Sequence, residues 1–321
     1  MTAEPETAPR GYDHAAVHYR SDAELLAVAV PFLEGGLTAG EPTMVSLEPA
    51  RAELVRGALP ASADVRYLTT DELYVRPAAA IKSYRTMMAG LVAGGATGIR
   101  IFGEIPRAVI DTSWDWWARY EAAVNHAYDE FPLRSMCAYD TRTTPRHVLD
   151  DVARTHPFVA TPGGRHGNAG YVDPPAFLAG PRPVAPLPIQ HTAPLVVLAD
   201  PRPAVARRAV LDLGKTDLPV AELDDLVLAV SEIVDNALRH GRAPVELRIW
   251  ADPDHLVVTV HDTGEGPGDP FAGLLPADRR IGGRGLWIAH QICSQVALYR
   301  DETGFTARLV AGDPWRHRPA D

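Results

Sequence analysis

Hydrophobic positions in the first half of the chain follow two alternating periods. Short apolar runs such as 42–48 are separated by longer segments with apolar residues at helical spacing. Ser21 followed by Glu24 has the form of a capping box, and the helix that it opens is expected to end near Gly35 and Gly36. The expected strands are 15–20, 42–48, 64–69, 98–105 and 134–140, and the expected helices are 21–36, 49–59, 77–95, 113–131 and 146–157. This alternation predicts an α/β domain with a mainly parallel sheet covered on both faces.

The second half groups its helices and strands differently. Two consecutive helices, 203–214 and 220–241, precede two strands, 244–251 and 255–262, in the first of which apolar residues occupy alternate positions. The other expected elements are a strand at 193–199, a helix at 285–293 and a hairpin of 295–300 and 305–311. This order predicts an α+β sandwich with helices on one face of a mixed sheet.

Proline and glycine dominate residues 161–193, which show no sustained period and are expected to form a partly extended linker. The expected organisation is a disordered tail (1–11), a first domain (12–160), this linker, a second domain (194–312) and a short tail (313–321).

Composition and charge narrow the location and the partners. The 321-residue chain carries a net charge of −10, which does not favour nucleic-acid binding. Its first residues have no signal-peptide pattern and no apolar run is long enough to span a bilayer, so neither secretion nor a membrane partner is expected. The cysteines, Cys137 and Cys293, both lie in apolar runs and are expected to be buried reduced thiols. A cytoplasmic location is therefore expected.

The helix 220–241 carries the first candidate chemistry. An apolar stripe accounts for its core face, and Glu232 and Asn236 lie four residues apart, which places them on one face a turn from each other. A carboxylate can accept a proton, and an amide oxygen suits Mg²⁺. Alone, the pair is equally typical of a solvated helix face.

Two later stretches add to this pair. Asp262 ends a strand and is followed by Gly264 and Gly266, which indicates a turn that lets backbone approach a flat ring. Glycines at 282, 283 and 285 directly precede a helix, a position where backbone N–H groups can bind phosphate.

In this order the three stretches resemble the N, G1 and G2 boxes of the GHKL ATPase superfamily. They stand as Glu232–Gly241, Asp262–Gly266 and Gly283–Leu286, and the similarity extends over about 195–310. The resemblance implies a Bergerat α/β sandwich that binds ATP and Mg²⁺. His240 and Gly241 are also explained as a helix end, where glycine favours the position after the last turn.

The resemblance also implies a role for each matching residue. Glu232 would be the general base and Asn236 the Mg²⁺ ligand. Asp262 would bind the adenine amine, with Thr263 and Gly264 beside the base, and residues 267–281, including Arg279 and Arg280, would form a lid. The implied nucleotide contacts are Asn236, Asp262, Thr263, Gly264, Gly266, Gly283, Arg284, Gly285 and Leu286.

Within the superfamily, the compact second half looks like the anti-sigma-factor serine/threonine kinases. That likeness implies a bacterial signalling regulator whose partners are a sigma factor and an anti-sigma-factor antagonist, with a homodimer as one option for its assembly. Two alternatives stay open: a sensor histidine kinase, for which His126 and His147 are poor acceptors because they lie in the α/β half, and a non-catalytic module that sequesters a partner in an ATP-dependent way.

The first half resembles the MEDS sensory domain named for methanogen and methylotroph regulators. The resemblance is carried by His14, "YRSDAELLAVAVPFLEGGLTAGEP", "MCAYD" and "THP" at 155–157, and it implies a RecA-like, Rossmannoid fold that senses a small molecule. No P-loop sequence is present, because "LEGGLTAGEP" lacks the lysine.

Parallel sheets bind ligands at the carboxyl ends of their strands, which gives a candidate sensory site. Its residues are Glu48, Glu104, Tyr139 and Asp140, with His14 and His156 as additions. The two histidines are equally well explained as partners of local backbone groups, and the cluster of Trp114, Trp116 and Trp117 is more typical of core packing than of a ligand cage. No spacing in the sequence requires a metal.

Overall fold

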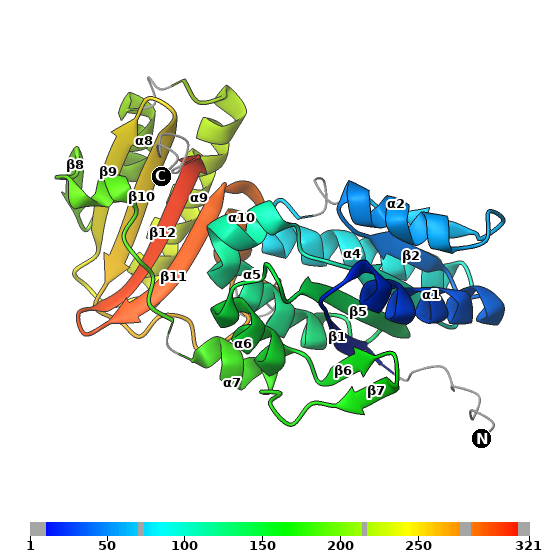
Figure 1. Cartoon of the computed structure of the whole chain (residues 1–321). Coiled ribbons are helices and arrows are strands. Elements are labelled where there is room, and N and C mark those ends of the chain that lie inside the picture. Colours follow the sequence, from blue (N-terminus) through cyan, green and yellow to red (C-terminus); the bar gives the residue numbers. More distant parts are fainter. Residues whose placement is uncertain (1–10, 70–73, 181, 214–216, 277–283, 314–321) are drawn as a thin grey trace. The chain divides into compact units, whose positions relative to one another are not determined.

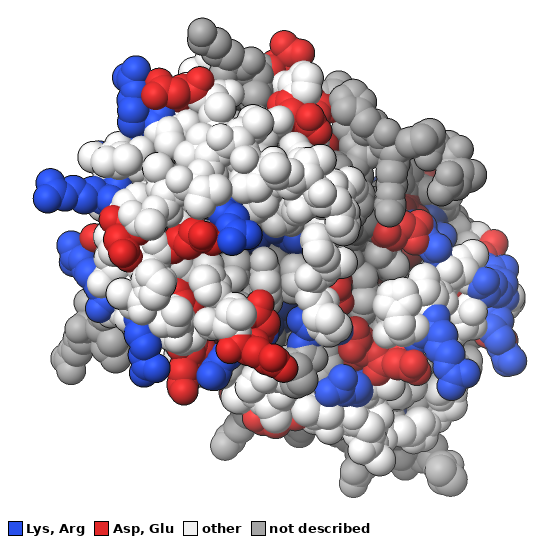
Figure 2. Space-filling view, turned by 90° about the vertical axis from the view of Figure 1, so that its left-hand side faces the viewer, with Lys and Arg blue, Asp and Glu red and all other residues white. Residues whose placement is uncertain are grey.

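The computed structural model describes residues 11–69, 74–180, 182–213, 217–276 and 284–313 (Figure 1). The chain divides into two compact units, one ending at Gly180 and the other beginning at Pro181. Among the described residues, no helix is both long and apolar enough to cross a membrane. Figure 2 shows acidic and basic side chains interspersed over one face of the described chain.

The first unit is built on a seven-stranded sheet in the order β3-β2-β4-β5-β1-β6-β7. Every neighbouring pair is parallel except β6 with β7. The strands are β1 (Asp13–Tyr19), β2 (Thr43–Ser46), β3 (Val65–Tyr67), β4 (Ile99–Gly103), β5 (Leu133–Asp140), β6 (Phe158–Thr161) and β7 (Gly164–Gly167). The prediction of an α/β domain with a mainly parallel sheet is confirmed.

Helices cover both faces of this sheet. They are α1 (Asp22–Ala39), α2 (Pro49–Ala58), α4 (Pro77–Ala93), α5 (Arg107–Ala127), α6 (Arg146–Thr155) and α7 (Pro174–Ala179). From β1, the connections through α1 and α2 move along the sheet toward the β3 edge, and the connections through α4, α5 and α6 move back toward β6. Because crossovers between parallel strands are right-handed, these two groups of helices lie on opposite faces of the sheet. The contacts agree, because α1 packs against α2 while α5 packs against α4, α6 and α7.

Three predicted helix boundaries in this unit differ from the structure by three residues or more. Helix α1 continues past Gly35 and Gly36 to Ala39, and ends at Gly40 with a φ of 68°. The two internal glycines instead make room for Arg100, because a Cβ on Gly36 would meet its Cδ at 2.8 Å and a Cβ on Gly35 its guanidinium at 2.8 Å. Helix α5 begins at Arg107, six residues before the expected start, but its backbone leaves the helical conformation at Ser113 (φ −148°), where the expected helix begins, and it ends at Ala127, four residues before the expected end.

The tryptophans expected in the core are buried there. Trp117 packs with Tyr120, their ring centroids 5.1 Å apart, and Trp114 Nε1 donates to Asp151 Oδ2 at 3.0 Å. Cys293 is a buried free thiol, as expected, but Cys137 is only partly buried.

The second unit is a two-layer sandwich of helices on a five-stranded sheet in the order β11-β12-β10-β9-β8. Its strands are β8 (Val196–Ala199), β9 (Glu246–Asp252), β10 (His255–Asp262), β11 (Gln295–Asp301) and β12 (Gly304–Gly312), and its helices are α8 (Pro203–Leu213), α9 (Val220–His240) and α10 (Arg284–Ile292). Helix α9 packs on β10 and β12 and contacts both other helices. The predicted α+β sandwich is confirmed.

All described strand pairs of this second sheet are antiparallel, which corrects the expectation of a mixed sheet. Two helices, α8 and α9, separate β8 from β9. A single helix would bring the chain back to the end of the sheet where β8 begins, and the next strand would then run parallel to β8. The second helix brings the chain back to the end where β8 finishes, so β9 runs antiparallel to β8.

Most of the expected linker is folded. Strand β7 pairs with β6, and α7 packs on α5 with Phe177 and Leu178 buried, so this stretch belongs to the first unit. Farther on, Leu187 packs with Trp250 on the second sheet, and a short 3₁₀ helix (Pro188–His191) follows it. The assignment of 161–193 to a linker failed because these apolar residues are too few to show a period.

Candidate functional site

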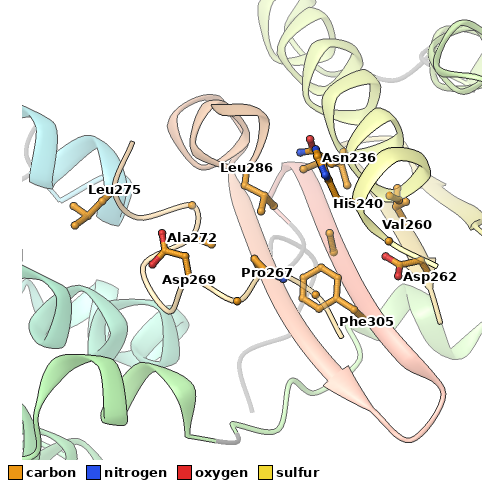
Figure 3. Close-up of a pocket in the computed structure, with 17 residues that line it drawn as sticks. Asn236, His240, Val260, Asp262, Pro267, Asp269, Ala272, Leu275, Leu286 and Phe305 are labelled. Atoms are coloured by element: carbon orange, nitrogen blue, oxygen red, sulfur yellow. The ribbon is translucent and has the colours of Figure 1, made fainter. Parts of the chain in front are cut away.

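A cavity of about 390 Å³ opens in the second unit among α9, the loop after β10 and the start of α10 (Figure 3). Its size lies within the usual range for small-molecule sites. Its lining is mostly apolar, with a few polar groups. The residues that line it are Ile233, Asn236, Ala237, His240, Gly241, Val260, Asp262, Gly266, Pro267, Gly268, Asp269, Ala272, Gly273, Leu275, Leu286, Phe305 and Ala307.

Asp262 is the buried carboxylate of this cavity, at 4% exposure. Its Oδ1 accepts hydrogen bonds from the backbone N–H of Arg242 at 3.0 Å and of Gly264 at 2.8 Å. Oδ2 has no hydrogen-bond partner among the described residues. The carboxylate is therefore held by one oxygen, and the other stays available to a donor in the cavity.

Two glycines are needed beside this carboxylate because of close approach. A Cβ on Gly241 would meet Asp262 Cγ at 2.5 Å and the carbonyl oxygen of Ala237 at 2.6 Å. A Cβ on Gly264 would meet Asp262 Oδ1 at 2.6 Å. The prediction that Gly241 serves as a helix-terminating glycine is incomplete, because its φ of −81° is open to any residue and its small size is what the site requires.

Glu232 and Asn236 lie one turn apart on α9, and the start of α10 packs directly against them. A Cβ on Gly285 would meet Asn236 Nδ2 at 2.9 Å and Glu232 Oε2 at 3.1 Å. Neither side chain makes a hydrogen bond or ion pair with another described residue. The pair thus faces the start of α10 without a polar partner among the described residues, unlike Asp235, which pairs with Arg239 on the same helix at 2.9 Å.

Only some of the other predicted nucleotide contacts line the cavity. Leu286 and Gly266 line the cavity, and Arg284 is the exposed first residue of α10. Thr263 and Gly264 are not among its described lining residues, and the Thr263 hydroxyl donates to the carbonyls of Arg242 and Ala243. Of the predicted lid, Pro267 to Leu275 contributes several lining residues, whereas Arg279, Arg280 and Ile281 lie outside the described residues. The predicted phosphate contact Gly283 and its neighbour Gly282 also lie outside them.

One aromatic residue that lines the cavity, Phe305, was not predicted from the sequence. Phe305 on β12 lines the cavity, and Gly266, at a φ of 77°, packs against its ring so closely that a Cβ would lie 2.4 Å from Cδ2. His240 is the last residue of α9 and also faces the cavity. The signal for Phe305 was available in the hairpin: β12 pairs Phe305 with Asp262 across from β10.

In the first unit, the predicted acidic residues meet at the carboxyl ends of β2, β4 and β5. Glu48, Glu104, Tyr139 and Asp140 all line one cavity of about 370 Å³. Arg51 holds both glutamates, with Nε 2.7 Å from Glu104 Oε2 and Nη2 2.6 Å from Glu48 Oε2. Burial raises the pKa of Glu104, and the Arg51 charge opposes that rise.

His14 and His156 are fully buried and are not among the described residues that line this second cavity. Their ring centroids lie 3.9 Å apart, and burial lowers the pKa of each to about 3. The structure therefore separates the predicted sensory residues into a cavity group and a buried histidine pair. Tyr139 belongs to both, since its ring lies 5.9 Å from that of His156.

Comparison with known protein families finds one match in each of the two units. Residues 13–157 match the family model of MEDS, the methanogen/methylotroph, DcmR sensory domain. Residues 198–311 match the model of the histidine kinase-like ATPase domain, a range that contains the Asp262 cavity. No curated protein sequence matches the chain significantly. The chain therefore joins an N-terminal MEDS sensory domain to a C-terminal histidine kinase-like ATPase domain, a pairing that supports a role as a signalling regulator.

Proposed function

We propose that the second unit binds ATP with Mg²⁺ in the Asp262 cavity, and that the protein is a bacterial regulator acting as an anti-sigma-factor-type serine/threonine kinase. The observation that carries the nucleotide proposal is the fixed carboxylate of Asp262 at the end of an apolar cavity, with Oδ2 unpartnered among the described residues. An exocyclic amine on a flat apolar ring is the complement of this arrangement.

In this proposal the adenine amine donates to Asp262 Oδ2, and the ring packs between apolar side chains such as Ile233, Val260 and Phe305. The phosphates then extend toward the start of α10, where backbone N–H groups and the helix dipole favour negative charge. Asn236, whose amide has no described partner, supplies an oxygen ligand for Mg²⁺. Its position against Gly285 places it beside that helix start.

Glu232 is the proposed general base. It would accept the proton of a partner's serine or threonine hydroxyl, whose oxygen then bonds to the γ-phosphorus while the bond to the ADP oxygen breaks. Its carboxylate has no ion-pair partner among the described residues, so it is available for this role. The proposed partners, a sigma factor and its antagonist, are drawn from the likeness to anti-sigma-factor kinases.

Binding is tested by titrating the purified chain with ATP and Mg²⁺ in a calorimeter. The wild type is expected to bind one ATP, Asn236→Ala to bind it more weakly, and the matched variant Asp235→Asn to bind it normally, because Asp235 pairs with Arg239 outside the cavity. A folded wild-type protein that binds no ATP contradicts the nucleotide proposal. Unchanged binding by Asn236→Ala contradicts only the role of that residue.

Transfer is tested by incubating the chain with radiolabelled ATP and proteins captured from its host, followed by phosphosite mapping. Acid-stable phosphoserine or phosphothreonine on a captured protein, lost in Glu232→Ala, is the expected result. Acid-labile phosphohistidine on the chain itself would identify a histidine kinase instead. A stable complex that Glu232→Ala leaves intact, without transfer, would identify a sequestering module.

We further propose that a signal bound by the MEDS domain controls the ATPase domain. The support is the pairing of the two domains in one chain. Transfer by the full chain is compared with transfer by residues 181–321 alone, with and without candidate small molecules. Equal activity under every condition would contradict the control.

A further inference from the structure

Four potential metal-ligating side chains meet inside the first unit, and they come from four different elements. They are His14 on β1, Glu121 on α5, Cys137 on β5 and His156 at the end of α6. One ligand atom from each lies within 4.8 Å of all the others. Three of the four residues are buried, and only Cys137 is partly exposed.

Three of the six distances between these atoms match the edges of a small coordination polyhedron, and all six lie within 4.8 Å. His14 Nε2 lies 3.3 Å from Glu121 Oε2 and 3.3 Å from Cys137 Sγ, and His156 Nε2 lies 3.4 Å from Glu121 Oε2. A tetrahedral zinc ion with ordinary bond lengths separates its N, O and S ligands by about 3.3–3.7 Å. The cluster is thus already near the size that one such ion requires.

Hydrogen bonding fixes which nitrogen of His14 faces the cluster. The Asn125 amide nitrogen donates to the carbonyls of Glu121, Ala122 and Thr155, so the Asn125 oxygen must be the atom that faces His14 Nδ1 at 3.1 Å. That oxygen can only accept, which puts the proton of the neutral ring on Nδ1. Nε2 of His14 therefore presents a lone pair to the cluster.

His156 is oriented in the same way. Its Nδ1 lies 3.0 Å from the carbonyl oxygen of Val152, which can only accept, so Nδ1 carries the proton and Nε2 a lone pair. Nε2 of His156 and Oε2 of Glu121 have no hydrogen-bond partner among the described residues, although both are buried. Lone pairs that face one another in a buried site are unfavourable unless a cation or a proton lies between them.

The outer contacts also resemble those of metal ligands. Tyr139 donates to Glu121 Oε1 at 3.1 Å, which leaves Oε2 as the inward oxygen. Each histidine donates its other ring N–H to an amide or carbonyl oxygen, the arrangement that orients imidazole ligands in metal sites. Cys137 is the one partly exposed member of the cluster.

We propose that His14 Nε2, His156 Nε2, Glu121 Oε2 and Cys137 Sγ bind one divalent metal ion of the zinc class. Binding replaces the thiol proton and the proton that the facing lone pairs hold in the metal-free cluster with bonds to the metal, and both protons leave to solvent. A doubly charged ion with one thiolate and one carboxylate is neutral overall, which suits a buried site. Mixed nitrogen, sulfur and oxygen ligands in a tetrahedron favour zinc over magnesium or calcium.

The test uses the full chain, stripped with a chelator and titrated with Co²⁺, whose spectrum reports tetrahedral geometry and thiolate coordination. One Co²⁺ per chain is expected, with a thiolate-to-cobalt absorption band that added Zn²⁺ abolishes. Cys137→Ala should remove the band, whereas Cys293→Ala, which changes the buried cysteine of the second unit, should keep it. His156→Gln should weaken binding by more than about 100-fold, since even outer partners cost 10–100-fold, and His147→Gln on the exposed face of α6 should not.

A second measurement does not depend on any variant folding. Zn²⁺ should slow the reaction of Cys137 with a thiol reagent in the wild-type chain, because the bound thiolate is shielded. A folded chain that takes up no Co²⁺, or that shows unchanged Cys137 reactivity with Zn²⁺, overturns the proposal and means that protons alone fill the cluster. A cobalt band that survives Cys137→Ala overturns it as well.

Discussion

Replacing Asp262 with asparagine isolates the hydrogen bond proposed for the adenine amine. The amide oxygen of the substituted side chain should occupy the place of Oδ1, because the backbone N–H groups of Arg242 and Gly264 both point at that atom and need an acceptor. The new NH₂ group then takes the place of Oδ2 and faces the adenine amine, so a donor meets a donor. The fold should survive, since both existing hydrogen bonds are kept.

The magnitude follows from the charge of the lost acceptor. A hydrogen bond to a charged group is worth about 1.5–3 kcal/mol. Its loss corresponds to about 10- to 150-fold weaker ATP binding. Inosine triphosphate carries an oxygen where ATP carries the amine, so Asp262→Asn should bind it better than the wild type does and reverse the preference for ATP.

The assay is a competition of ATP and inosine triphosphate against a fluorescent nucleotide, for the wild type, Asp262→Asn and Asp235→Asn. Asp235 is not among the described residues that line the cavity and forms an ion pair with Arg239, so its variant should keep both affinities. The reasoning is refuted if Asp262→Asn is folded, binds ATP within about twofold of the wild type and retains the same preference between the two nucleotides.

Three further outcomes are expected. Gly241→Ala should lower the melting temperature and weaken ATP binding, since its Cβ would lie 2.5 Å from Asp262 Cγ, at a cost of about 1–3 kcal/mol, whereas Gly57→Ala on α2 of the first unit, with open space around its Cβ, should do neither. Arg51→Ala should destabilise the first unit most near neutral pH and least at acidic pH, measured by urea unfolding. Burial raises the pKa of Glu104, which means that its charged form is unfavourable in the fold, and the variant removes the Arg51 charge that opposes this rise. The contribution of Glu104 to the free energy of unfolding is therefore present below its unfolded pKa and is lost as the pH rises through its folded pKa. Finally, a first-unit fragment that ends before α7 should be less stable to urea than one that ends at Gly180, by about 3–6 kcal/mol for two large apolar side chains re-exposed.

The architecture of both units could be predicted because the spacing of apolar residues within short segments indicates the helices and strands. Apolar periodicity located nearly every element, and the strand–helix alternation indicated the parallel sheet of the first unit. Boundaries were wrong where a tertiary contact overrode a local signal, as where Gly35 and Gly36 accommodate Arg100 inside α1. Strand β7 was missed because its four residues, Gly164–Gly167, are all exposed and contain no apolar side chain.

The Asp262 cavity was partly predictable for a similar reason. Glu232, Asn236 and Asp262 stand in short motifs, and the fold brings Asn236 and Asp262 to one cavity. Phe305 comes from β12 and enters only through strand pairing. The His14–His156 cluster was out of reach of spacing arguments, because its residues are spread from β1 to the end of α6 and meet only in the folded sheet.

The fixed carboxylate of Asp262 has a consequence for what the second unit can distinguish. Two backbone N–H groups orient it before any ligand arrives, so its ordering belongs to folding and the anchor is preorganised. In the proposed nucleotide site this anchor would select the base and would not distinguish ATP from ADP, since both carry the same adenine. Under that proposal, discrimination between ATP and ADP would depend on the other end of the cavity, where α9 meets α10, and substitutions at the two ends would change base selectivity and phosphate selectivity separately.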